Sequence, residues 1–229
     1  MENDKNVMRW GGLASILAFI VWIVEMPLYG FVDPFTPEGL MRFTNVRTAL
    51  GISTILMMTI AFMSIALVLA LYRALQGANM AFALFGSVLG VLGYIVTALG
   101  DASTFFAFAP ISDLNQAPAV TPEMQATVVL LWQATQGITH TFFFVGSLFM
   151  VLCFIVLGMT MLSAPVFGKL FGGVSMVLGV IGILGVVSSL FVTGDIGVQV
   201  MGISVFANLI FLPLFGWKVY SLSKGPRSQ

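Results

Sequence analysis

The sequence predicts an all-α fold, a bundle of six transmembrane helices that forms one polytopic membrane domain over residues 1–229. Apolar residues make up 59% of the chain and charged residues 8%, whereas about a quarter of the residues in a typical soluble domain are charged. Several apolar runs reach the roughly 20 residues that a helix needs to cross about 30 Å of hydrocarbon. The expected surrounding is therefore the lipid bilayer. Nucleic acid is not an expected partner, because nine basic and nine acidic residues cancel.

The expected spans cover approximately residues 10–31, 48–72, 80–100, 137–162, 170–192 and 198–217. In the first span, small and polar side chains recur at spacings of three and four, which predicts one helical face turned toward the inside of the bundle. These residues are Gly11, Ser15, Ala18, Trp22, Glu25 and Tyr29. The apolar run ends in Glu25-Met26-Pro27 without a small-x-small motif, so cleavage as a signal peptide is not expected.

Two segments between the spans carry recognisable signals. Thr36-Pro37-Glu38 is typical of a helix start and predicts a short interfacial helix before the second span. Residues 101–125 contain no lysine or arginine and hold three phenylalanines. This composition favours a long aromatic loop at the membrane surface, serving as an anchor or, alternatively, as a lid.

A helix that starts at Pro122 could continue without a further proline to Leu162. At 1.5 Å per residue it would be about 60 Å long, twice the hydrocarbon thickness. Either its first part projects outward, or it breaks near Gly137.

Lysine and arginine residues concentrate on one side of the predicted bundle. That side, with both termini, holds Lys5, Arg9, Arg73, Lys169, Lys218, Lys224 and Arg227, and the other side holds Arg42 and Arg47. The excess predicts that both termini lie in the cytoplasm.

The chain also resembles itself. One ungapped shift pairs Gly51-Ile52-Ser53 with Gly137-Ile138-Thr139, and Val91-Leu92-Gly93 with Val177-Leu178-Gly179. This predicts a parallel internal repeat in which spans two and three correspond to spans four and five. Chance similarity among Gly- and Leu-rich helices is the alternative. In the second copy, His140 stands in place of Thr54 and Gln136 in place of Leu50, so polar groups have been gained there.

The candidate binding residues lie toward the outer side. Gln133, Gln136 and His140 follow one helical stripe, and His140 is the only histidine. Glu25 lies inside the outer end of the first span, where a carboxylate must be protonated, paired or hydrated, and His140 is its expected partner. The full set of ligand-binding or proton-relay candidates is Glu25, His140, Gln133, Gln136, Asp101, Asp195 and Asn208.

The alternative is that Glu25 and His140 satisfy each other and merely fix the packing. Asn208, near the centre of span six, is expected to join helices or to cap carbonyl groups freed by Pro213. No catalytic residue is assigned, because no nucleophile motif occurs. No metal or cofactor is expected either, because one histidine and several carboxylates make a poor ligand set.

Several motifs resemble a known family. Gly158-Met159-Thr160-Met161-Leu162-Ser163, then Leu170-Phe171-Gly172-Gly173, and the closing Phe215-Gly216-Trp217-Lys218-Val219-Tyr220 are similar to a family of uncharacterised bacterial six-span proteins, domain of unknown function 4386. The resemblance covers about half of the chain. It implies six spans and a bacterial cell membrane, and it implies no activity.

The sequence thus predicts an integral membrane protein that binds or passes a small or lipid-like molecule through an outward-facing polar pocket. A non-catalytic scaffold or regulatory partner of another membrane protein, or of a second copy, is the first alternative. An intramembrane enzyme that uses Glu25 and His140 as an acid–base pair is the second.

Overall fold

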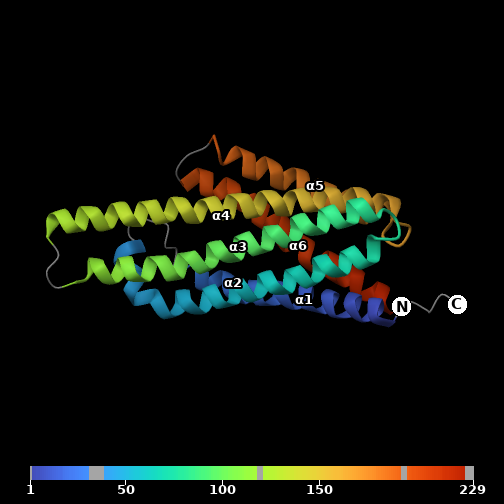
Figure 1. Cartoon of the computed structure of the whole chain (residues 1–229), viewed down its shortest axis with the longest axis horizontal. Coiled ribbons are helices and arrows are strands. Elements are labelled where there is room, and N and C mark those ends of the chain that lie inside the picture. Colours follow the sequence, from blue (N-terminus) through green and yellow to red (C-terminus); the bar gives the residue numbers. More distant parts are fainter. Residues whose placement is uncertain (1, 31–38, 118–120, 192–194, 225–229) are drawn as a thin grey trace.

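The computed structural model describes residues 2–30, 39–117, 121–191 and 195–224, and six helices account for almost all of them (Figure 1). The helices are α1 (Glu2–Gly30), α2 (Gly39–Leu75), α3 (Met80–Asn115), α4 (Pro122–Ser163), α5 (Gly168–Ser188) and α6 (Asp195–Ser223). Each helix contains a stretch long and apolar enough to cross a membrane. The predictions of an all-α fold and of six helices of spanning length are therefore confirmed for the described residues.

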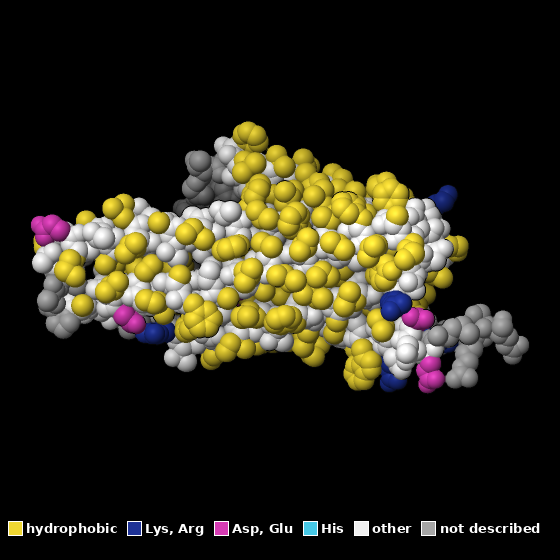
Figure 2. Space-filling view, viewed as in Figure 1, with side chains coloured by type: hydrophobic (Ala, Val, Ile, Leu, Met, Phe, Trp, Pro, Cys, Tyr) yellow, Lys and Arg dark blue, Asp and Glu magenta, His cyan; other side chains and the backbone are white. Residues whose placement is uncertain are grey.

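Consecutive helices run in opposite directions, so both ends of the chain lie at the same end of the bundle (Figure 1). The turns between α2 and α3 and between α4 and α5 lie at that end as well. Apolar side chains cover the middle of the molecule, and the charged side chains visible in this view lie toward the two ends (Figure 2). This distribution suits a helical bundle that is surrounded by lipid.

The largest correction concerns the segment after residue 100, which the sequence analysis treats as a loop. The helix α3 continues through it to Asn115 and has 36 residues, which is about 54 Å. The continuation is stabilised by tertiary packing, because the Phe108 ring stacks on Trp132 of α4 at a centroid distance of 4.3 Å. Phe108 is buried and Phe105 is half-buried, so only Phe106 of the three phenylalanines is exposed enough to act as an anchor.

The helix α4 is unbroken over 42 residues, about 63 Å, and it passes through Gly137 without interruption. The alternative of a break near Gly137 is therefore wrong, and the projection of the first part from the membrane stays a prediction. At its start, the Thr121 hydroxyl group accepts a hydrogen bond from the Met124 backbone N–H at 3.3 Å, as the sequence signature predicts. The helix α2 is likewise a single helix from Gly39, without a separate interfacial helix. The predicted start at 36–38 lies outside the described residues.

The parts of α2, α3 and α4 that lie farthest from the termini form a three-helix projection, which has a hydrophobic core of its own. In this projection an ion pair joins α2 to α3, because Arg47 Nη1 of α2 lies 2.8 Å from Asp113 Oδ1 of α3. Two rings flank Trp132, with Phe108 stacked on it and Phe43 edge-on at 5.9 Å. The buried core of this projection comprises Leu40, Phe43, Leu50, Phe108, Ala109, Ile111, Val128 and Trp132.

Close approach between helices depends on small residues. A Cβ atom added at Gly93 of α3 would lie 3.0 Å from the carbonyl oxygen of Gly146 of α4, so the two backbones nearly touch. Hydroxyl groups add bonds between helices. The Ser15 hydroxyl of α1 donates to the carbonyl oxygen of Leu212 of α6 at 2.7 Å, and the Ser175 hydroxyl of α5 donates to that of Phe154 of α4 at 2.6 Å.

The aligned glycines of the predicted repeat pack on the same helix. Gly93 of α3 lies against Met150 of α4, and Gly179 of α5 lies against Ile155 of α4. If the two copies packed equivalently, Gly93, the counterpart of Gly179 in the first copy, would lie against α2, because α2 is the counterpart of α4. The internal repeat therefore stays a prediction.

Candidate functional site

Glu25 is a buried carboxyl group inside the bundle. It lies five residues before the end of α1, on the face predicted to point inward, and 1% of its surface is exposed. The Ser53 hydroxyl group of α2 donates a hydrogen bond to Glu25 Oε1. The other carboxyl oxygen, Oε2, is buried and has no hydrogen-bond partner among the described residues. Glu25 therefore retains an unused acceptor in an apolar surrounding, where such a group is costly.

A second buried carboxyl group comes from α3. Asp101 is 8% exposed, and it lies close enough to Glu25 for their charges to interact. From the sequence, Asp101 is expected just after the end of the third span. In the structure α3 continues to Asn115, so Asp101 lies within the helix. Two carboxylates of like charge repel each other strongly in a medium of low dielectric constant, so the pair needs a proton or a cation between or beside them.

Hydroxyl groups extend this polar layer from α3 to α4. The Ser103 hydroxyl lies 3.1 Å from the Thr139 hydroxyl, and either group can be the donor. Ser103 and Thr104 also donate to the carbonyl oxygen of Gly100, at 2.8 Å and 3.0 Å. The layer thus draws one or more side chains from each of α1, α2, α3 and α4.

The predicted stripe on α4 is not the face that packs into the bundle. Gln133 is exposed, and Gln136 and His140 are half-buried. The residues that α4 buries here are instead Trp132 and Thr139. Because Trp132 packs against Phe43 and Phe108, the wide aromatic side chain determines which face turns inward.

The predicted pairing of Glu25 with His140 is replaced by a bond from Ser53. Ser53 is not among the predicted site residues, and neither are the hydroxyl-bearing Ser103 and Thr139. The sequence feature that could have indicated Ser53 is the adjacent polar pair Ser53-Thr54, which lies at the depth of Glu25. Nothing in its spacing indicates which helix it faces.

Asn208 belongs to a second polar cluster nearer the middle of the bundle. The Tyr94 hydroxyl of α3 donates to Asn208 Oδ1 of α6 at 2.7 Å, and Asn208 Nδ2 lies 3.9 Å from the Met150 sulfur of α4. The buried Ser64 hydroxyl of α2 donates to the carbonyl oxygen of Ile60 within its own helix, at 2.7 Å. Asn208 therefore joins helices, the role expected of it, and the bonds go to Tyr94 and Met150 rather than to carbonyl groups near Pro213.

Beyond Asn208, toward the end with the termini, aromatic rings fill the interior. Phe211 stacks on Phe154 at a centroid distance of 4.0 Å and on Phe215 at 4.2 Å, and all three side chains are buried. A continuous polar path past Asn208 is therefore absent from this part of the described bundle. Asp195 is the first residue of α6, and its side chain lies outside the described residues.

The arrangement can bind a small positive charge. Glu25 of α1 accepts a hydrogen bond from Ser53 of α2 and keeps one carboxyl oxygen unpartnered, and the second buried carboxyl group, Asp101 of α3, is within range of its charge. Among the described residues, no three or more His, Cys, Asp or Glu side chains gather in a way that could hold a metal ion. A comparison with known protein families, with curated proteins and with solved structures finds no match to this chain.

Proposed function

We propose that this integral membrane protein binds a proton or a small inorganic cation at Glu25 and Asp101, and that this binding accompanies the passage or capture of a small molecule from the outer side. The observation that carries the proposal is the buried Glu25 carboxyl group, which has one bond from Ser53 and one unpartnered oxygen, together with a second buried carboxyl group, Asp101, within range of its charge. Ionisable residues inside a membrane bundle are costly and mark ion or proton pathways.

The orientation and the family are part of the same proposal. Lys5, Arg9, Arg73, Lys169, Lys218 and Lys224 belong to the helix ends and turns at the end of the bundle that carries the termini. This distribution supports a cytoplasmic location for that end in the plasma or inner membrane, and it leaves the projection outside. The resemblance to bacterial six-span proteins agrees with six spans and adds no activity.

Infrared difference spectroscopy on the protein in lipid nanodiscs tests the site directly. A protonated carboxyl group inside the bundle gives a C=O stretching band that appears and disappears as the pH is stepped between mildly acidic and alkaline values. We expect this band in the wild type and its loss in both Glu25→Gln and Asp101→Asn. If a metal cation replaces the proton, sodium or potassium chloride will remove the wild-type band, whereas choline chloride will not.

Asp113→Asn is the matched control, because Asp113 is an exposed carboxylate ion-paired with Arg47 at the tip of the projection. It must leave the band unchanged. A spectrum that neither Glu25→Gln nor Asp101→Asn alters would remove the proposed site.

A non-catalytic scaffold is the second candidate, and the sealed inner half favours it. Stacked Phe154, Phe211 and Phe215 close the interior beyond Asn208, and the packed glycines face other helices of the same chain. Passage through the bundle would require these rings to separate. If the infrared band is absent, the carboxyl pair is a packing element, and the scaffold becomes the better description. The acid–base enzyme has no support in the geometry, since the hydrogen bond to Glu25 comes from Ser53.

A further inference from the structure

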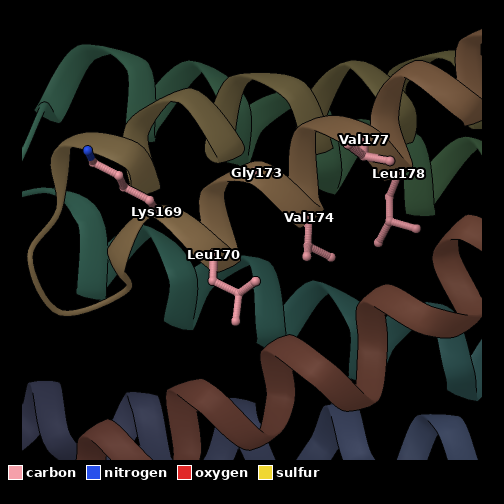
Figure 3. A pocket seen from close by; sticks show the side chains of 6 residues that line it. All are labelled: Lys169, Leu170, Gly173, Val174, Val177 and Leu178. Carbon is pink, nitrogen blue, oxygen red and sulfur yellow. The ribbon is translucent and has the colours of Figure 1, made fainter.

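A groove runs along α5 near the end of the bundle that carries the termini, far from the carboxyl pair in the sequence and in the fold. It has a volume of about 330 Å³, and its walls come from Lys169, Leu170, Gly173, Val174, Val177 and Leu178. Figure 3 shows Leu170, Val174 and Leu178 pointing from α5 to the same side, toward α6, while the Lys169 amino group points away toward the end of the helix. The groove is thus apolar along its length and basic at its mouth.

The length of the groove matches one leaflet of a bilayer. From Lys169 to Leu178 the helix rises about 14 Å, close to the roughly 15 Å that one leaflet contributes to the hydrocarbon core. Gly173 lies between Leu170 and Val174 and leaves the floor open, because a Cβ atom added there would meet nothing within 4 Å. The space therefore suits an extended acyl chain that enters from the end of α5.

The charge at the mouth is positive and has no acidic counterpart in this part of the chain. Besides Lys169, the amino group of Lys218 lies 5.1 Å from the centroid of the Phe171 ring, which brings a second positive charge beside the first turn of α5. From residue 124 to residue 229 the only acidic residue is Asp195, which begins α6 at the opposite end of that helix. By contrast, Arg73 at the same end of the bundle has Asp4 3.7 Å away.

We propose that this groove binds one anionic phospholipid, with an acyl chain along Leu170, Gly173 and Val174 and the phosphate group near Lys169 and Lys218. Basic side chains at the membrane surface attract anionic headgroups, whereas the apolar lining, which comes from α5, would accept any lipid. The preference for negative charge is therefore the property that distinguishes a binding site from ordinary contact with the bilayer.

Native mass spectrometry of the protein released from neutral detergent micelles tests the proposal, with phosphatidylglycerol and phosphatidylcholine of identical acyl chains as competing probes. We expect one phosphatidylglycerol molecule to be retained in preference to phosphatidylcholine. Lys169→Gln should lower this preference about fivefold, the effect of one basic residue near an anionic membrane surface. Gly173→Leu fills the groove and should lower retention of both lipids.

Two controls make the outcome specific. Lys224→Gln removes a lysine at the same end of the bundle whose amino group lies over the Tyr220 ring at 4.4 Å, and it should keep the wild-type preference. Gly137→Leu places the same side chain at an equally open position of α4 and should keep wild-type retention. Equal retention of the two lipids by the wild type, or unchanged retention by Gly173→Leu, would overturn the proposal. Lys169 is exposed, so Lys169→Gln leaves the fold intact and keeps the test decisive even if Gly173→Leu does not fold.

Discussion

At the scale of single residues, two buried serine hydroxyl groups have opposite surroundings. Ser53 donates to the Glu25 carboxylate, whereas the Ser87 hydroxyl of α3 is buried without a hydrogen-bond partner among the described residues. We expect Ser53→Ala to lower the free energy of unfolding by roughly 1–2 kcal/mol, because it leaves both oxygens of a buried carboxyl group without a donor. Thermal unfolding of the purified protein in one detergent measures the difference.

Ser87→Ala is the matched control, since it removes the same hydroxyl group from a neighbouring helix. It should be neutral or should raise the free energy of unfolding by up to about 1 kcal/mol, because an unsatisfied polar group is lost. Equal destabilisation by the two substitutions would mean that the bond to Glu25 adds nothing beyond the packing of a small side chain.

The residues of the candidate site could be predicted only one helix at a time. The face of α1 that holds Glu25 follows from the spacing of its small residues, and its burial agrees with that prediction. The partner of Glu25 could not be deduced in this way, because the choice between Ser53 and His140 depends on how α2 and α4 are rotated around their axes. That rotation is determined by large side chains such as Trp132, and periodicity within a single helix does not report it.

At the scale of the helices, substitutions at two glycines distinguish the effect of helix packing on stability from the effect of helix propensity. A Cβ atom at Gly93 would lie 2.7 Å from Met150 Cγ and 3.0 Å from the carbonyl oxygen of Gly146, whereas one at Gly137 would meet nothing within 4 Å. We expect Gly93→Ala to destabilise the protein by about 1–3 kcal/mol, because α3 and α4 must move apart. Unfolding in the same detergent provides the measurement.

Gly137→Ala makes the identical chemical change in α4 and should stabilise the protein by up to about 1 kcal/mol, since alanine is the better helix former. If Gly93→Ala also proved stabilising, the close approach of α3 and α4 would not contribute to the stability of the bundle.

The existence of all six helices could be predicted from apolar runs, and the length of α4 as one of two alternatives, but the lengths of α2 and α3 could not. Asp101, Ser103 and Thr104 resemble a helix end in the sequence, and Pro110 resembles a stop. In the folded chain the Ser103 and Thr104 hydroxyl groups bond to the Gly100 carbonyl oxygen, Ser103 also bonds to Thr139, and Phe108 packs on Trp132, so the helix continues. Tertiary packing thus overrides local signals, as it commonly does.

At the scale of the whole molecule, the two ends of the bundle differ in shape and in charge. One end carries both termini, two short turns and most lysines and arginines, and the other carries the three-helix projection, where Arg47 is paired with Asp113. The helices α3 and α4 are each about 60 Å long, roughly twice the hydrocarbon thickness. The projection must therefore stand outside the membrane on one side. The excess of positive residues supports the proposal that the opposite side is cytoplasmic.

The chain offers a natural background for testing this orientation, because its single cysteine, Cys153, is 1% exposed inside the bundle and should not react with a maleimide. Gly77→Cys places a thiol in the exposed turn between α2 and α3, and Ala117→Cys places one at the exposed end of the projection. With a membrane-impermeant maleimide added to intact cells, Ala117→Cys should be labelled and Gly77→Cys should not. After permeabilisation both should be labelled, which shows that each thiol is accessible. The reverse pattern in intact cells would place the projection in the cytoplasm, and Glu25 and Asp101 would then serve a site that opens to the inside, since both lie in the half of the bundle nearer the projection.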